Sequence, residues 1–451
     1  MAASHLESDG FRPHSAARKT QAHLRGAWQG PNDTLTVLRQ TQLALYTGRR
    51  AVAQWLAIPA ATQTPARHGG GVIDFDRSHA GLEARARWSV GPVDMVTGLA
   101  VDDQRDDRRG YENFTGTAPN QTLGVTGRLR RDEVNRARST DGYLQGELAQ
   151  PARLHLVDGL RSGRVELSAA DWFLGNGDDS GSLAYGYDNP VLGLRWQAMA
   201  GLNLHLSVAR GFESPTLGEL AYRADGSGGF NTALLPQTSR QAEAGLKWRA
   251  GAWALDLALF EIRTADEIGV ATSSGGRSAF QNVGRTLRRG AEIGLAFKPG
   301  GAWLAQLSAS TLSARYRDSF LACAGVPCTA LTLPVAAGNR IAGAPQGSAW
   351  AELVWAGGPW GEWALEARGL GRTAVNDRNT DFAAGHAVGA LRWSGAYPLG
   401  AGLRLEILAR LDNIGNHRHE GSVIVGEANG RFFEPGAPRS GLLALRLVAG
   451  L

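Results

Sequence analysis

The sequence predicts an all-β chain that crosses a membrane as an antiparallel transmembrane β-barrel. Three observations predict this fold: apolar and polar residues alternate with a period of two, the connections between such segments are short and long in turn, and tryptophans gather near segment ends. The composition agrees, because 60 glycines and 13 tryptophans with only 3 methionines in 451 residues fit one large β domain.

The alternation assigns the individual strands. In residues 403–411 every odd position is apolar, whereas Arg404, Glu406 and Arg410 fall on the other face. The same period recurs in residues 202–208 and 253–259. Because successive side chains of a strand point to opposite faces, one face can meet hydrocarbon and the other water. A soluble β-sandwich alternates in the same way, so this pattern alone leaves both folds open.

The spacing of the turns favours the barrel. Short connections at 249–252, 298–302, 356–362 and 398–402 alternate with long ones. Outer-membrane barrels have tight turns at the periplasmic rim and large loops at the extracellular rim. We therefore expect residues 209–240 and the polar span 263–284 in long loops at one rim, and 298–302 in a tight turn at the other.

Tryptophans near strand ends are a further sign of a membrane. Amphipathic rings gather at the two membrane interfaces of such barrels, whereas a sandwich would bury them in its core. The rings in question belong to Trp248, Trp253, Trp303, Trp355, Trp360, Trp363 and Trp393. No run approaches the length of about 18 apolar residues that a transmembrane helix needs, so strands are expected to make the crossings.

Five segments in this order resemble the barrel of TonB-dependent outer-membrane receptors: 209–220, 234–268, 281–297, 411–416 and 434–447. The resemblance implies a place in the bacterial outer membrane, in contact with its lipid, and uptake of a small molecule energised by TonB–ExbB–ExbD. It also implies 22 strands, of which this chain would supply about 17, beginning at residues 15–28. A signal peptide, a TonB box and a plug are not visible, so residues 1–451 are expected to be a partial barrel domain with the plug missing.

Four polar segments resemble loops of the members that transport pyrroloquinoline quinone, a planar molecule with three carboxylates: 175–181, 221–229, 273–277 and 421–435. Such a ligand needs arginines for two-point carboxylate pairing and aromatic rings for stacking. The resemblance implies a ligand site made by Tyr222, Arg223, Arg277, Arg431 and Phe433, with the three arginines converging toward the lumen. For each arginine, an ordinary solvated loop charge is the alternative.

Other functions remain open or are disfavoured by the residues. A ferric siderophore is the alternative ligand, and a passive or non-functional barrel fragment is the alternative to transport. No enzyme is expected, because a G-x-S-x-G elbow or another catalytic signature is not found. Nucleic acid is not an expected partner, since Lys and Arg alternate with Asp and Glu along the chain despite a net charge of +5. No cofactor is expected, and the two histidines of residues 417–420 lack a third metal ligand at a typical spacing.

The two cysteines of the chain lie close together in a long loop. Cys323 and Cys328 follow the strand expected at residues 304–316. The extracellular compartment is oxidising, and a pair that closes a short loop is typical of a disulfide. We therefore expect Cys323 and Cys328 to be joined.

Overall fold

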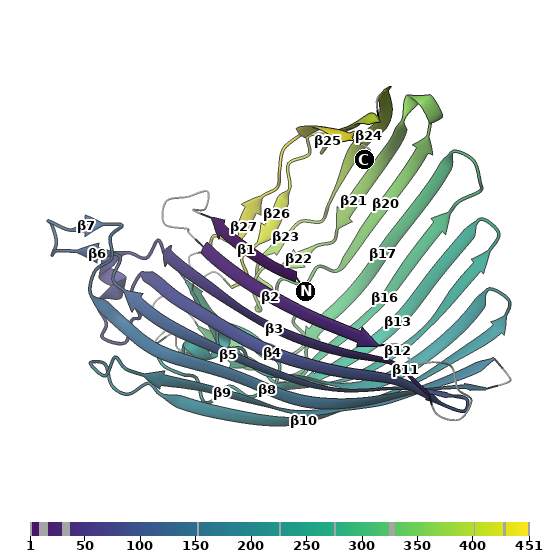
Figure 1. Cartoon of the computed structure of the whole chain (residues 1–451). Helices are drawn as coiled ribbons and strands as arrows, with labels where there is room; N and C mark the ends of the chain where they lie inside the picture. Colours follow the sequence, from purple (N-terminus) through teal and green to yellow (C-terminus); the bar gives the residue numbers. More distant parts are fainter. Residues whose placement is uncertain are drawn as a thin grey trace.

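The computed structural model describes residues 2–8, 17–28, 37–150, 153–224, 227–274, 277–323, 330–400, 402–426 and 430–449. These residues form one large antiparallel sheet of 18 strands, which curves around a hollow (Figure 1). Within the described part of the chain, no helix is long and apolar enough to cross a membrane.

The strands of the large sheet are β1 (Ala2–Ser8), β2 (Ala17–Trp28), β3 (Val37–Trp55), β4 (Val72–Val90), β5 (Val93–Tyr111), β8 (Leu129–Gln150), β9 (Leu154–Asp171), β10 (Gly181–Met199), β11 (Leu202–Glu213), β12 (Gln237–Ala250), β13 (Trp253–Ala265), β16 (Thr286–Phe297), β17 (Trp303–Tyr316), β20 (Gly347–Ala356), β21 (Glu362–Leu370), β24 (His386–Gly400), β25 (Leu403–Asp412) and β28 (Ser440–Ala449). Each strand pairs with its neighbours in chain order.

The connections contain the remaining elements. Two-stranded sheets are formed by β6 (Phe114–Thr115) with β7 (Thr122–Leu123), β14 (Ile268–Ser274) with β15 (Arg277–Asn282), β18 (Phe320–Cys323) with β19 (Leu331–Val335), β22 (Thr373–Ala374) with β23 (Phe382–Ala383), and β26 (Glu420–Val423) with β27 (Phe433–Pro435). The described connections also contain the short 3-10 helices η1 (Ala60–Gln63), η2 (Glu219–Ala221) and η3 (Gly358–Trp360).

Short and long connections alternate as the sequence predicts. Residues 298–302 join β16 to β17 in a tight turn, and the polar span after β13 forms a long connection that contains β14 and β15. The prediction of a loop over 209–240 was too wide, because β11 runs to Glu213 and β12 begins at Gln237. The strands continue past the apolar belt as a hydrogen-bonded ladder, so polar side chains alone do not end them.

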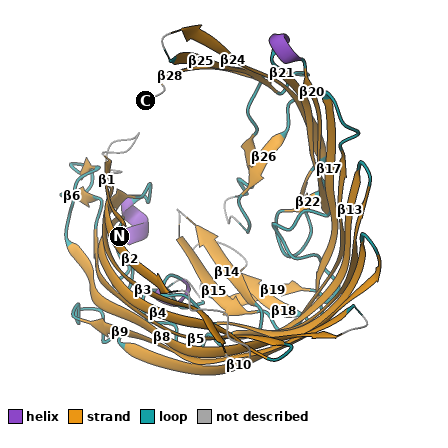
Figure 2. Ribbon diagram, turned by 45° about the vertical axis from the view of Figure 1, so that its right-hand side comes forward, coloured by secondary structure: helices purple, strands orange, loops and turns teal. Residues whose placement is uncertain are grey.

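The number of strands agrees with the prediction apart from one addition. The sheet has 17 strands from β2 onward, and β1 precedes them as an eighteenth. Between the described residues of β28 and β1 there is no strand pairing, and Figure 2 shows these two strands on opposite sides of an opening. In the described residues the sheet is therefore a curved wall with an opening between β28 and β1.

The two faces of the wall differ as the alternation predicts. The convex face exposes apolar side chains along each strand, such as Leu206 and Leu259, which are 53% and 55% exposed. The concave face of the same strands carries His205, whose ring lies 3.1 Å from the carboxylate of Glu243. A face of exposed leucines is stable against hydrocarbon, and the polar face against a water-filled lumen.

Paired aromatic rings mark the rim that carries the tight turns. Trp253 lies against Phe297 with ring centroids 4.2 Å apart, and the centroids of Trp303 and Trp355 are 6.3 Å apart. Trp253 and Trp303 are 42% and 49% exposed, so they are not core residues. They form the aromatic girdle that the sequence predicts for a membrane interface.

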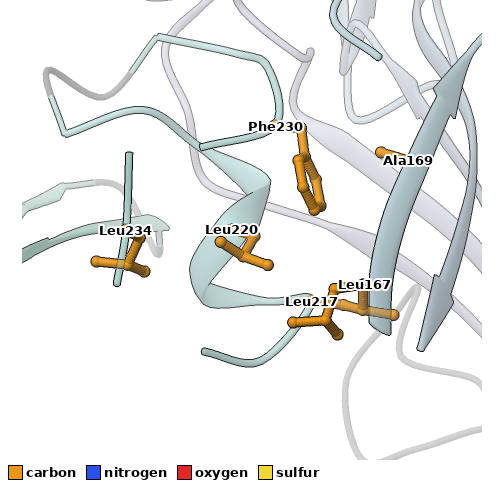
Figure 3. Close-up of a cluster of buried hydrophobic side chains, with 6 residues drawn as sticks. All are labelled: Leu167, Ala169, Leu217, Leu220, Phe230 and Leu234. Atoms are coloured by element: carbon orange, nitrogen blue, oxygen red, sulfur yellow. The ribbon is translucent and has the colours of Figure 1, made fainter. Parts of the chain in front are cut away.

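The described residues of the connection from β11 to β12, 214–224 and 227–236, fold back onto the concave face. Their apolar side chains pack on β9 and make the main buried cluster (Figure 3), formed by Leu167, Ala169, Leu217, Leu220, Phe230 and Leu234. The hydroxyl of Thr216 accepts from the amide of Glu219, whose carboxylate accepts from the amide of Thr216, and these two bonds hold the turn that leads into η2. This long loop is therefore a packed part of the wall.

Candidate functional site

Hairpins from four long connections lie on the concave side of the sheet, near the loop-bearing rim. Figure 2 shows β14, β15, β18, β19, β22 and β26 inside the arc of the large sheet. A hairpin satisfies its own backbone hydrogen bonds, so it can extend into a lumen without the support of the large sheet. These elements are far apart in sequence and approach one another only through the curvature of the wall.

A pocket of about 230 Å³ lies where these hairpins meet. Its apolar wall comes from β14, β18, β19 and the β26–β27 connection, and includes Val335 and Phe432. Its polar wall comes from residues 376–381, which include Arg378 and Asp381. An apolar wall with a few convergent polar groups is typical of a small-molecule site.

Asp377 holds the polar wall of this pocket in place. Its Oδ1 atom accepts from the hydroxyl of Tyr316 at 2.7 Å and from the amide of Ala342 at 3.3 Å, and its carbonyl accepts from the Asn339 side chain at 2.9 Å. Burial raises the pKa of the Asp377 carboxyl above its ordinary range. Asp377 therefore anchors the loop, and Arg378 and Asp381 are the charged groups left to face a ligand.

Tyr222 lies in a second cluster, next to η2. Its ring is 7% exposed and has the guanidinium carbons of Arg131 and Arg108 at 4.7 Å and 5.7 Å from its centroid. Arg131 also pairs with Glu133 at 2.8 Å. The aromatic surface predicted to stack on a ligand is occupied by two cationic side chains in this structure.

Arg223 continues the same cluster. Its Nη2 atom lies 3.1 Å from Oδ1 of the buried Asp179, whose Oδ2 accepts from Asn176 at 3.1 Å. The Arg223 side chain is 37% exposed. The pair ties the loop after β11 to the connection between β9 and β10, so Arg223 already has a carboxylate partner within the protein.

The other predicted residues lie on two further hairpins. Arg277 begins β15, and its side chain lies outside the described residues, whereas Ala279 of the same strand packs against Tyr222. Phe433 begins β27 and is 45% exposed, whereas its neighbour Phe432 lines the pocket. Neighbouring residues of an extended chain point to opposite sides, so the ring of Phe432 lies in the pocket and the ring of Phe433 faces solvent. Convergence of the three predicted arginines stays a prediction.

The sequence reasoning missed several residues of these clusters: Arg108, Arg131, Asp179, Arg378 and Phe432. Arg378 had a weak signal, because residues 376–381 read as a polar loop. The others become neighbours only through contacts between distant strands.

The histidines of residues 417–420 lie next to His386, a contact that the sequence did not predict. The ring centroid of His419 lies 4.4 Å from that of His386 and 6.3 Å from that of His417. Even so, the described residues contain no group of three His, Cys, Asp or Glu side chains placed to hold a metal ion. Cys328 lies outside the described residues, so its disulfide with Cys323 also stays a prediction.

A comparison with known families agrees with this architecture of a curved antiparallel wall, an apolar outer face and rim hairpins. Residues 5–414 match the model described as the β-barrel of TonB-dependent receptor-like proteins. The chain belongs to the TonB-dependent receptor family. Receptors of this family are outer-membrane proteins, which agrees with the apolar convex face.

Solved structures of similar fold include the copper transporter OprC (TM-score 0.70, 16% identity, 95% of this chain and 64% of that chain covered). The ferric yersiniabactin uptake receptor FyuA from Yersinia pestis has a TM-score of 0.69 and 14% identity, with 96% of this chain and 62% of that chain covered. The siderophore receptor PiuA from Acinetobacter baumannii has a TM-score of 0.71 and 14% identity, with 96% of this chain and 65% of that chain covered. The chain thus spans less than two thirds of the length of these structures. At such identities the likeness extends to the fold alone.

Proposed function

We propose that this chain is the barrel part of a TonB-dependent transporter that captures a small anionic molecule at its loop-bearing rim. The observation that carries the proposal is the meeting of four hairpins around one pocket on the concave side. The rim with long loops faces the outside of the cell in outer-membrane barrels, so a ligand would meet this pocket before it enters the lumen.

The residues around the pocket suit an anion with an apolar surface. Arg378 supplies a planar guanidinium group, and Phe432 supplies a ring to the same pocket. Arg431 directly precedes Phe432 and is the candidate for a second cation. Arginine pairs with carboxylates at two points, and an aromatic ring packs against a planar ligand. Asp381 in the same pocket would favour a ligand that also offers hydrogen-bond donors.

Transport in this proposal uses the mechanism of the family. TonB with ExbB and ExbD would energise the opening of a path through the barrel, and this chain would contribute the wall and the capturing loops. No bond is made or broken, so no catalytic residue is required. The proposal therefore predicts binding and passage of a ligand and no turnover.

Pyrroloquinoline quinone is the ligand we propose. Its support is the resemblance of four loop segments, which include Tyr222, Arg223, Arg277, Arg431 and Phe433. A ferric siderophore is the second candidate, because FyuA and PiuA are named for ferric yersiniabactin uptake and as a siderophore receptor. The two ligands are alternatives for the same rim, so a test must offer both.

Calorimetric titration of the receptor in detergent with pyrroloquinoline quinone, and separately with a ferric hydroxamate siderophore, tests the proposal. Arg378→Ala, Arg431→Ala and Arg277→Ala should each weaken quinone binding by roughly ten- to a hundredfold, as for loss of one charge-assisted pair. Arg105→Ala, on the convex face, is the matched control and should change affinity by less than about threefold. If the protein bound the siderophore and not the quinone, the siderophore would be assigned as the ligand. If it bound neither, a passive barrel fragment would be favoured.

A further inference from the structure

The convex face carries a dense group of arginines just above the apolar belt. This arginine cluster consists of Arg210, Arg240, Arg263, Arg285, Arg289 and Arg317. All six line one recess of about 660 Å³, and all six are exposed. They come from β11, β12, β13, β16 and the ends of adjoining connections.

The strand register places this cluster on the lipid-facing side. On β11, Arg210 is the next outward position after Leu206 and Val208, which are 53% and 47% exposed. On β13, Arg263 follows Leu259 along the same face, with Glu261 between them. The rim hairpins lie on the opposite, concave side (Figure 2). The arginines therefore lie where the apolar belt gives way to the extracellular interface.

The cluster places like charges directly side by side. Arg210 is the register partner of Arg240, which is the register partner of Arg263 on the next strand. Directly opposed residues of an antiparallel pair have β-carbons about 4.5–5.5 Å apart, and like charges at that spacing destabilise the sheet. An anion from outside that neutralises this row would relieve the repulsion.

Carboxylates within the protein neutralise part of the charge. Glu261 pairs with both Arg263 and Arg289 at 2.6 Å, and Asp318 pairs with Arg285 at 2.7 Å. The six arginines thus have two carboxylates among them. In the part of the chain that the structure describes, Arg210 and Arg240 have no ion pair with a carboxylate.

On β3 to β5, another part of the same convex face, outward arginines have carboxylate partners. On β5, Arg105 pairs with Asp107 at 2.6 Å, and on β3, Arg49 pairs with Asp76 of β4. Each of these outward arginines has its own carboxylate. Arg105 also lies directly opposite Arg136 of β8, so opposed arginines recur on this face, but there Asp107 lies within the same group, whereas Arg210 and Arg240 have no such carboxylate among the described residues.

We propose that the arginine cluster binds the phosphate groups of an anionic lipid in the outer leaflet. Guanidinium groups pair with phosphate oxygens at two points, and several of them around one recess can hold a doubly phosphorylated headgroup. Leu287 lines the same recess, and the leucines below it would contact the acyl chains. A soluble anion would gain the charge pairing but not the apolar contact, which is why a lipid is the fitting occupant.

Binding of diphosphoryl lipid A, and of the same lipid with its phosphates removed, to the receptor in non-ionic detergent tests the proposal. The double variant Arg210→Ala/Arg240→Ala should bind the phosphorylated lipid at least about tenfold more weakly, whereas Arg105→Ala should stay within about threefold of the parent protein. Binding to the parent should weaken as salt rises, because the cluster is exposed. Heat-modified mobility in gels confirms that each variant is folded.

A second variant changes the affinity in the opposite direction. Glu261→Gln removes a neutralising carboxylate without adding bulk, so the phosphorylated lipid should bind more tightly, which a merely structural role would not produce. The proposal would be overturned if the protein bound the two lipids equally, or if Arg105→Ala lost as much affinity as the double variant. It would also be overturned if inorganic phosphate competed with the lipid at micromolar concentration. Titration of the double variant with pyrroloquinoline quinone should be unchanged, so this test is independent of the proposed transport ligand.

Discussion

Leu220→Ala should detach the connection between β11 and β12 from the concave face. Leu220 is 0% exposed and packs with Phe230, Leu234 and the β9 residues Leu167 and Ala169 (Figure 3). Truncation of a fully buried leucine costs about 2–5 kcal/mol, because the transfer energy is lost and a cavity remains. A loss of about 2 kcal/mol already raises the opening equilibrium of the loop roughly thirtyfold.

Hydrogen exchange followed by mass spectrometry measures this opening directly. Peptides that cover residues 214–224 and 227–236 should exchange at least about thirtyfold faster in Leu220→Ala, while peptides of β13 stay unchanged. Leu235→Ala is the matched control in the same loop, because its side chain is 50% exposed and its removal leaves no enclosed cavity. If exchange of these peptides accelerated equally in both variants, or did not accelerate in Leu220→Ala, the buried cluster would not be what holds the loop.

The same perturbation connects packing to function. Tyr222 and Arg223 lie two and three residues after Leu220, so their contacts with Arg131 and Asp179 depend on the docked loop. If the resemblance of this segment to ligand loops reflects a binding role, Leu220→Ala should weaken ligand binding although it touches no ligand. Unchanged affinity in an opened loop would show that residues 222–223 are dispensable for capture.

Three further predictions follow from single features. Mass spectrometry without reductant should find Cys323 and Cys328 linked, and two alkylatable thiols would contradict the disulfide. Leu257→Arg, in the middle of the outward row of β13, should lower the free energy of unfolding in bilayers by about 2–4 kcal/mol in urea titrations, and Leu257→Ala by less; similar effects would argue against a lipid-facing position. The Arg285 side chain, through its hydrogen bond, holds the pKa of Asp318 at about 2, below the ordinary 3.8. This carboxylate therefore stabilises its loop above that ordinary value and ceases to do so as the pH falls to about 2, so exchange protection of residues 317–323 should fall over this range in the parent but not in Asp318→Asn.

The sequence by itself determined the strands and the class of the fold. The period of two in residues 202–208, 253–259 and 403–411 became β11, β13 and β25, and the tight turn at 298–302 is where the sequence places it. These features are predictable because alternation and turn chemistry are local, and each strand meets two different solvents along its whole length. The same locality explains why the limits of the loop over 209–240 were wrong, since strand ends depend on pairing with neighbours.

Only the tertiary structure decided which loop residues meet. Tyr222 packs under Arg108 and Arg131, and Phe432 lines a pocket with residues 376–381. Both arrangements depend on contacts between segments far apart in the chain. The arginine row of the convex face likewise arises from the register of three strands, since Arg210, Arg240 and Arg263 are unremarkable one at a time. The physical reason is that a β-wall brings distant residues together through its ladder and curvature, which the local pattern of apolar and polar residues does not encode.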